Sequence, residues 1–188
     1  GAPQSASEVV ESVTPEVVDL DHLVASPSQL RFWLLDNVSS GVAAYNNALC
    51  FTIRGRLDFE RLQQAVDALI QRHEILRTRY VLDQGTLFQK IQDPFTPTIE
   101  RLSVIKLPVD RAPAEFEDIA SAIIDANAFP LFRLAVASSG DDEHTLLMVL
   151  HHCICDGWTL GRLPQEISAL YEDPNAQSDW GQYREIPQ

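Results

Sequence analysis

The feature that most constrains the fold is an apolar run at residues 145–150 (TLLMVL) that leads directly into a pair of histidines. Five consecutive apolar residues bounded by a turn signal are typical of a strand buried on both of its faces. Such a strand needs a packed layer on each side. The run therefore predicts a central strand with functional side chains placed at its end.

Residues 151–157, directly after this run, read His-His-Cys-Ile-Cys-Asp-Gly. Imidazole is the side chain best suited to exchange a proton near neutral pH, so His151 and His152 are candidate catalytic groups. Asp156 followed by Gly157 predicts a tight bend that folds the carboxylate back beneath the histidines. A single histidine on a strand is more often a packed or solvated residue. The pair with Asp-Gly at this spacing instead favours a catalytic strand end.

A metal site is the alternative for the same segment, because imidazoles and thiols are both metal ligands. If the strand continued, alternation would point His151, Cys153 and Cys155 to one face and His152 to the other. The sequence holds no second Cys/His pair at zinc-site spacing, and its other thiol, Cys50, is isolated. We therefore predict no metal.

Helix and strand signals alternate along the chain, which predicts a mixed sheet flanked by helices. Asp58 is the expected N-cap of one helix, and residues 83–85 (Asp-Gln-Gly) are a hairpin signal. The expected helices cover residues 28–37, 59–73, 116–124 and 160–171, and the expected strands cover residues 46–53, 76–82, 86–91, 132–137 and 145–150.

Composition limits the classes of function. The chain has 188 residues, 45% of them hydrophobic, which is enough for one good core and one domain. A net charge of −13 argues against nucleic acid and anionic membrane as partners. No apolar run approaches the length of a membrane span. Three cysteines, an odd number without framework spacing, indicate free thiols and a cytoplasmic location.

Three segments, in order, resemble motifs of the condensation domains of nonribosomal peptide synthetases. Residues 26–33 (SPSQLRFW) are similar to the first motif, Ser-x-x-Gln-x-Arg-x-Trp. Residues 72–80 (RHEILRTRY) are similar to the second, Arg-His-Glu-x-Leu-Arg-Thr-x-Phe, with Tyr80 in place of Phe. Residues 151–157 resemble the signature His-His-x-x-x-Asp-Gly. Arg31-Phe32-Trp33 and Tyr45-Asn46 are a weaker signal for a fungal polyketide–peptide hybrid synthase.

The resemblance implies an α/β fold like that of chloramphenicol acetyltransferase, an αβ sandwich in each of two lobes. Residues 23–188 would be the N-terminal lobe, preceded by an acidic linker at residues 1–22. A tunnel would run between this lobe and the C-terminal lobe. Acyl or peptidyl carrier proteins, the other lobe and neighbouring synthase domains are the expected partners. No directly bound cofactor is expected, because phosphopantetheine arms of the carriers deliver both substrates.

The resemblance also implies the reaction, in which an amine on one carrier attacks a thioester on the other and forms an amide. His152 would accept the amine proton or orient the amine. His151 would hold the loop and the tautomer of its neighbour. The backbone N–H of Gly157 is a candidate donor to the developing oxyanion.

Asp156 is expected to be structural, as a buried carboxylate paired with Arg77, which the second motif supplies. Arg72 is a further supporting residue at the end of a helix, where capping and surface pairing are the ordinary roles of such residues. Two alternatives stay open. One is a coenzyme A-dependent acyltransferase of the same superfamily, which has a similar His-x-x-x-Asp-Gly; the other is a non-catalytic lobe for carrier docking. The isolated lobe is expected to fold but to be inactive, because half of the tunnel would be missing.

Overall fold

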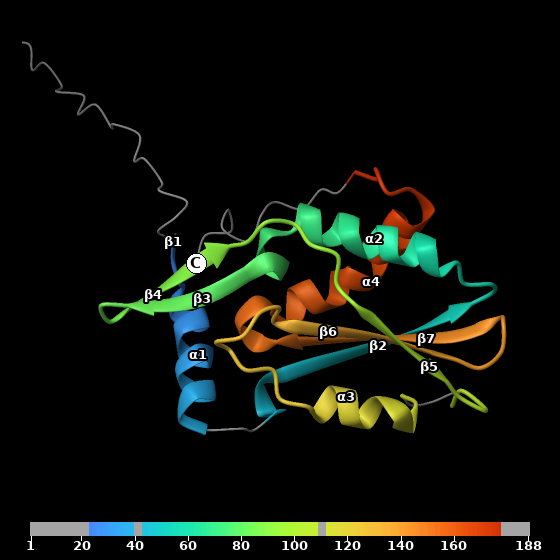
Figure 1. Cartoon of the computed structure of the whole chain (residues 1–188), viewed down its shortest axis with the longest axis horizontal. Coiled ribbons are helices and arrows are strands. Elements are labelled where there is room, and N and C mark those ends of the chain that lie inside the picture. The colour runs from blue at the N-terminus through green and yellow to red at the C-terminus, as the bar shows by residue number, and fades with distance from the viewer. Residues whose placement is uncertain (1–22, 40–42, 109–111, 178–188) are drawn as a thin grey trace, which may run out of the picture.

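The structure is a computed structural model of the chain, and it describes residues 23–39, 43–108 and 112–177. The expected linker, residues 1–22, lies outside the described residues. Helices and strands alternate along the chain (Figure 1), as the sequence predicts. Their order is β1 (Leu23–Val24), α1 (Pro27–Ser39), η2 (Ala43–Tyr45), β2 (Asn46–Arg54), α2 (Phe59–Arg72), η3 (Glu74–Arg77), β3 (Thr78–Asp83), β4 (Thr86–Ile91), β5 (Ile99–Ser103), η4 (Ala114–Phe116), α3 (Glu117–Ser121), β6 (Phe132–Ser138), β7 (Glu143–His151), η5 (His152–Ile154) and α4 (Gly157–Glu172).

The larger sheet is mixed and has the strand order β2-β7-β6-β5. Strand β7 is antiparallel to both of its neighbours, whereas β5 runs parallel to β6. Helices α2 and α4 lie on one face of this sheet and α3 lies on the other (Figure 1). Every residue of β7 after Glu143 is buried, which confirms the strand expected to be covered on both faces.

A smaller antiparallel sheet, β1-β4-β3, contains the predicted hairpin. The backbone φ angles are 47° at Gln84 and 84° at Gly85, so both central turn residues are left-handed. Two such residues make the turn that matches the twist of paired strands, and glycine takes this conformation without steric cost. The sequence predicted the hairpin but not that it would form a sheet of its own.

Helix α2 begins where the sequence places its cap. The Oδ1 atom of Asp58 accepts hydrogen bonds from the N–H groups of Glu60, at 2.9 Å, and Arg61, at 3.1 Å. These bonds satisfy two of the donors that a helix leaves open at its start. The cap fixes the start of the helix, whose apolar side then faces the sheet.

The third predicted helix is shorter than expected. Helix α3 ends at Ser121, and Ala122 is extended, with ψ 133°. The carbonyl of Ala122 accepts hydrogen bonds from Nδ2 of Asn46, at 2.9 Å, and Nη1 of Arg133, at 2.7 Å. These tertiary bonds satisfy a carbonyl that would otherwise favour another helical turn. Strand β5 was also missed, because it lies in a proline-rich stretch and pairs with β6, which is distant in the sequence.

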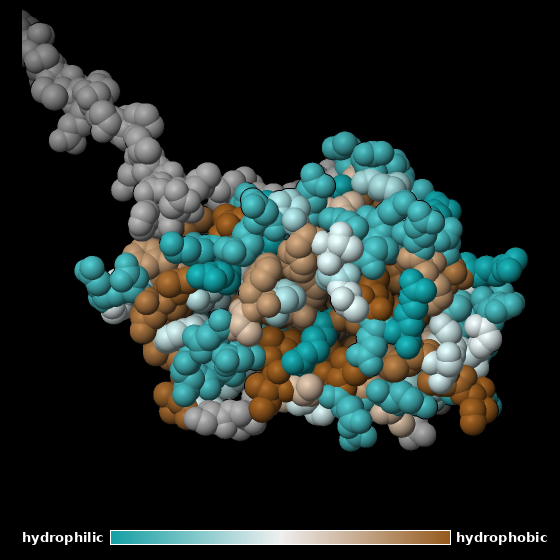
Figure 2. Space-filling view, in the orientation of Figure 1, coloured by the Kyte–Doolittle hydropathy of each residue, from teal (hydrophilic) through white to brown (hydrophobic). Residues whose placement is uncertain are grey.

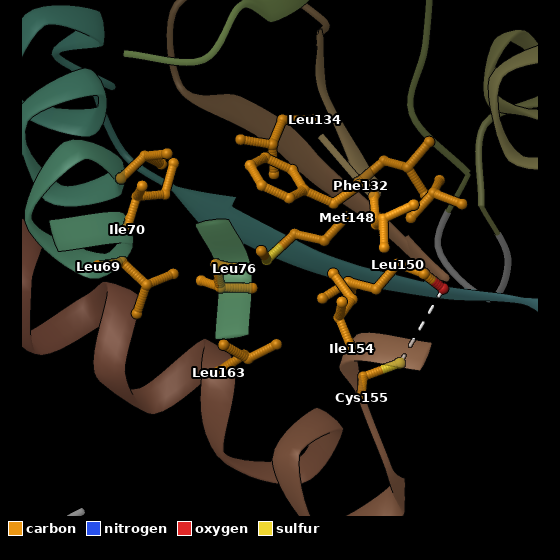
Figure 3. Packing of buried hydrophobic residues seen from close by; sticks show 14 of the residues in the cluster. Leu69, Ile70, Leu76, Phe132, Leu134, Met148, Leu150, Ile154, Cys155 and Leu163 are labelled. Atoms are coloured by element: carbon orange, nitrogen blue, oxygen red, sulfur yellow. Dashed lines mark hydrogen bonds between the residues drawn. The ribbon is translucent and has the colours of Figure 1, made fainter. Parts of the chain in front are cut away.

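The core fills the space between the larger sheet and its helices. Figure 3 shows side chains of α2, α4 and β7 meeting there, among them Leu69, Leu163 and Met148. Each of these three side chains is at most 2% exposed. Burial of a side chain of this size contributes about 1.5–3 kcal/mol to the stability of the fold. This packed layer therefore holds β7 in place, together with the histidines at its end.

One helix leaves apolar side chains on the surface. Brown surface in Figure 2 lies over α1, at the left of the view. The exposed large apolar residues of α1 are Leu30, Leu34, Leu35 and Val38, and Val38 is 80% exposed. Within the described residues, no helix has the length and apolar character needed to cross a membrane.

Candidate active site

His151 is the last residue of β7, and it is completely buried. Its Nδ1 atom accepts a hydrogen bond from the backbone N–H of Cys153 at 3.1 Å. Because Nδ1 accepts, the proton of the neutral imidazole belongs on Nε2. The bond caps η5, the turn that begins at His152. His151 therefore lies where it can hold the turn that carries its neighbour.

The other ring nitrogen of His151 faces the carboxylate of Asp36 on α1. Nε2 of His151 lies 3.7 Å from Oδ1 of Asp36, beyond hydrogen-bond length. The second oxygen of Asp36 accepts the N–H of Ala126 at 2.9 Å. Burial lowers the pKa of His151 below its ordinary 6.5 and outweighs the opposing effect of Asp36. His151 is therefore neutral at pH 7.

His152 is half-buried and begins η5. Its imidazole stacks on the ring of Phe32 from α1, with centroids 4.1 Å apart and planes 9° apart. Within the described part of the chain, neither ring nitrogen of His152 has a hydrogen-bond partner. One face of the imidazole is thus covered, while its two nitrogens make no hydrogen bond to a described residue.

Asp156 and Gly157 lie at the start of α4. The carbonyl of Asp156 accepts the N–H of Leu160 at 3.0 Å, which makes Asp156 the N-cap residue, a position that favours Asp. Asp156 is exposed, so the predicted buried carboxylate beneath the histidines was wrong. The physical reason is that η5 interrupts the strand after His151 and Asp156 directly precedes helix α4, so no tight bend returns the carboxylate to the histidines. Gly157 is the first residue of α4, where backbone N–H groups have no partner within the helix.

The structure does not bring Arg77 to Asp156. Nη1 of Arg77 donates to the carbonyl of Gln92 at 2.7 Å, and Nη2 lies 3.8 Å from Oε1 of Glu74. No contact with Asp156 occurs among these described partners, so the predicted ion pair was wrong. Arg77 is held instead by the carbonyl of Gln92 and by Glu74 of its own turn, while its Nε has no hydrogen-bond partner among the described residues. An exposed carboxylate at a helix start needs no buried cation, because the surrounding solvent reduces the cost of its charge.

Arg72 instead belongs to a cluster that joins two helices. Nη1 of Arg72 donates to Oε1 of Glu166 at 2.6 Å, and Nη2 contacts the carbonyl of Ala176. Nε2 of His73 lies 2.8 Å from Oε2 of the same Glu166, which is 6% exposed. Burial raises the pKa of Glu166, but the bonds with His73 and Arg72 lower it further, below its ordinary value. The cluster fixes the end of α2 against the middle of α4.

Several residues around the histidines were missed from the sequence. The hydroxyl of Tyr80 donates to the carbonyl of Cys153 at 2.6 Å, and Nδ2 of Asn47 donates to Sγ of Cys155 at 3.4 Å. Tyr80 had a signal, because it is the position that departs from the second motif. Phe32, Asp36 and Glu166 had none, because their roles depend on contacts between distant segments.

The cysteines of this segment are buried thiols. Burial raises the pKa of both Cys153 and Cys155 to about 12, so both are protonated. Sγ of Cys155 lies 3.4 Å from the carbonyl of His151 and 4.0 Å from that of Leu150, the contact drawn in Figure 3. The alternation expected for a continuing strand does not occur, because η5 interrupts it. The described residues include no group of three or more His, Cys, Asp or Glu that could hold a metal.

Most of the chain matches the sequence model of a known protein family. The model of the condensation domain matches residues 19–184, so the chain belongs to the condensation-domain family.

Relatives of the chain are peptide synthases. It is 31% identical to bacitracin synthase 3 of Bacillus licheniformis over 168 residues, and 34% identical to surfactin synthase subunit 1 of Bacillus subtilis over 161 residues. These alignments cover 89% and 86% of this chain, but 3% and 4% of the synthases. Cyclosporin synthetase of Tolypocladium inflatum is 33% identical over 150 residues, which cover 80% of this chain and 1% of that protein. Because the bacterial and fungal relatives are about equally similar to this chain, its origin in a fungal hybrid synthase stays a prediction.

Solved structures establish the fold. The starter condensation domain of rhizomide synthetase matches with a TM-score of 0.75 and 19% identity, covering 85% of this chain and 40% of that one. The X-domain from teicoplanin biosynthesis matches with a TM-score of 0.74 and 22% identity, covering 89% and 36%. The predicted chloramphenicol acetyltransferase-like α/β fold is thereby confirmed, and the chain spans well under half of either solved chain.

Proposed function

We propose that this chain is the N-terminal lobe of an amide-forming condensation domain that joins a carrier-bound acyl or peptidyl donor to a carrier-bound aminoacyl acceptor. The observation that carries the proposal is the imidazole of His152. It is half-buried at the end of a fully covered strand, and its nitrogens have no partner among the described residues. Membership of the condensation family supplies the reaction class.

In the proposed reaction the acceptor amine attacks the thioester carbon of the donor. A C–N bond forms, the C–S bond breaks, and the proton lost by the amine ends on the departing sulfur. His152 would take this proton or hold the amine in the attacking orientation, and such assistance is worth about 10²–10⁴-fold. The N–H of Gly157, at the start of α4, is the proposed donor to the transient oxyanion.

The substrates would arrive on phosphopantetheine arms of two carrier proteins, and we propose no bound cofactor beyond these arms. The remaining lobe would supply the other wall of the tunnel. The exposed apolar residues of α1 support a further packing partner, because an apolar patch on a soluble domain often marks an interface. Bringing both tethered reactants together would remove much of the entropic barrier.

The test is a condensation assay on the full two-lobed domain with donor and acceptor loaded on their carriers. His152→Ala is expected to slow turnover by at least about a hundredfold without a change in melting temperature. Asp156→Asn is expected to keep the fold, because asparagine caps a helix as well as aspartate does. His144→Ala removes a buried imidazole that bonds Ser138 and Asp141 at the other end of β7, so it is the comparison for loss of stability without loss of the reacting group.

Three other outcomes would reject the proposal. If His152→Ala turns over like the wild type, His152 is not the reacting group. If the wild type transfers acyl groups only from coenzyme A, the chain belongs to an acyltransferase of the same superfamily. If it binds carriers but transfers nothing, the lobe serves in docking.

A further inference from the structure

Phe32 contacts the imidazole that the proposed function depends on. The two rings are nearly parallel, at 9°, with their centroids 4.1 Å apart. This separation is slightly shorter than the about 4.5–7 Å typical of aromatic pairs, so the two ring faces are in direct contact. Because neither nitrogen of His152 is bonded to a described residue, the stack is the ring contact that sets the plane of the imidazole.

Phe32 is itself held firmly. It precedes Trp33, which is 7% exposed and donates from Nε1 to Oδ1 of Asn127 at 3.1 Å. A second ring, that of Tyr45, meets Phe32 edge-on at 6.2 Å. Both contacts restrict the rotation of the segment around Phe32. The Phe32 ring that stacks on His152 is therefore held in place by its neighbours and is not a mobile surface side chain.

Helix α1 is also joined to the histidine turn at a neighbouring point. Sγ of Cys153 lies 3.8 Å from the carbonyl of Gln29, one helical turn before Phe32. Asp36, one turn after Phe32, faces His151. Residues 29, 32 and 36 thus present one side of α1 to the turn. The packing of α1 against the turn therefore sets the position of Phe32. A ring fixed in this way can hold the plane of the imidazole that stacks on it.

We propose that Phe32 is a positioning residue that holds the imidazole plane of His152, so that a ring nitrogen points toward the reacting amine. This inference rests on the proposed function. Phe32 occupies the position before the tryptophan, which the pattern Ser-x-x-Gln-x-Arg-x-Trp leaves unspecified. A positioning residue that acts through one stack is expected to change kcat by about three- to tenfold.

The first measurement is made on the chain itself by solution NMR and does not depend on activity. The carbon-bound ring protons of His152 are expected to resonate upfield, because they lie over the Phe32 ring. Phe32→Leu should remove this displacement, and Phe32→Tyr should keep it. Phe95→Leu is the matched control, since Phe95 is a half-buried ring that stacks on Phe132 and has no ring contact with His152.

The second measurement compares kinetics of the full condensation domain. Phe32→Leu should lower kcat by about three- to tenfold with KM unchanged, Phe32→Tyr should restore the rate, and Phe95→Leu should leave it unaltered. If Phe32→Leu does not fold, Phe32→Met replaces it, because methionine fills irregular space without a ring.

The inference is overturned if the His152 resonances do not move in the ringless variant, if kcat stays at the wild-type value, or if KM alone rises. These failures are distinct from failure of the proposed function. That function fails when His152→Ala is fully active, whatever Phe32 does.

Discussion

At the scale of single residues, the histidine turn depends on His151 being neutral. Its Nδ1 accepts the N–H of Cys153, and a protonated imidazole would place two donors against each other there. The pKa of His151 is depressed below 6.5, chiefly by burial, with a smaller contribution from the charge of His152, while Asp36 and Asp125 act in the opposite direction. Acid should therefore loosen the turn that presents His152.

The first prediction concerns the free energy of unfolding as a function of pH. Below an ordinary pKa of 6.5 the unfolded chain binds a proton that folded His151 does not, so stability falls as the pH drops toward the folded pKa. His151→Asn keeps an acceptor for Cys153 and removes the titration. Between about pH 7.5 and 5.5 the wild type should lose more stability than His151→Asn, by up to about 1.4 kcal/mol per pH unit.

Denaturant unfolding followed at several pH values measures this difference. Equal losses in the two proteins would show that His151 does not titrate differently on folding.

At the scale of secondary-structure elements, α4 is fixed by the buried cluster around Glu166. The same carboxylate binds Arg72, at 2.6 Å, and His73, at 2.8 Å, both at the end of α2. Helix α4 begins at Gly157, directly after the proposed catalytic turn. The cluster therefore restrains a helix whose first residue belongs to the proposed site.

Glu166→Gln is expected to lower the free energy of unfolding by about 1–3 kcal/mol near pH 7, because the buried partners lose a charged acceptor. Glu172→Gln, at an exposed position of the same helix, should change it little. The folded pKa of Glu166 is depressed, so this stabilisation is present above its ordinary 4.5 and is lost as the pH falls through the folded value.

Thermal or denaturant unfolding at neutral and acid pH checks this prediction. The difference between wild type and Glu166→Gln should shrink in acid. A constant difference at all pH values would mean that packing, not the charge of Glu166, fixes the helix.

At the scale of the whole molecule, the described residues supply a complete core but an open site. Two pockets of the lobe lie away from the histidines, one lined by Phe95 and Phe132 and the other by Phe51 and Tyr171. Helix α1, which carries Phe32, has apolar side chains on its outer side (Figure 2). These features agree with the proposal that the chain is one lobe and that a second lobe completes the substrate tunnel.

Residues 1–188 alone are accordingly expected to unfold cooperatively but to catalyse no condensation, whereas the two-lobed domain is expected to catalyse it. Calorimetry and a carrier-loaded assay on the two proteins test this. Measurable condensation by the 188-residue chain would contradict it and would place the whole reaction on this lobe.

A feature could be predicted from the sequence when the interactions behind it join residues that are close together along the chain. The cap at Asp58 and the hairpin at Gln84 and Gly85 are governed by neighbouring residues, and both were predicted correctly. The helix expected to reach Ile124 stops at Ser121, because tertiary hydrogen bonds hold the carbonyl of Ala122. The pairing of Arg77 with Asp156 failed for a related reason, since a tertiary hydrogen bond to the carbonyl of Gln92 holds the guanidinium elsewhere.

The sequence by itself determined the α/β class, the buried strand β7 and the two histidines at its end, because periodicity and motif spacing are local properties of the chain. Only the tertiary structure decided what surrounds the histidines. Phe32 and His152 are 120 positions apart, and Arg72 and Glu166 are 94 apart, so nothing in the local pattern marks them as partners. They meet because burial of the helix faces on the sheet fixes how distant segments pack.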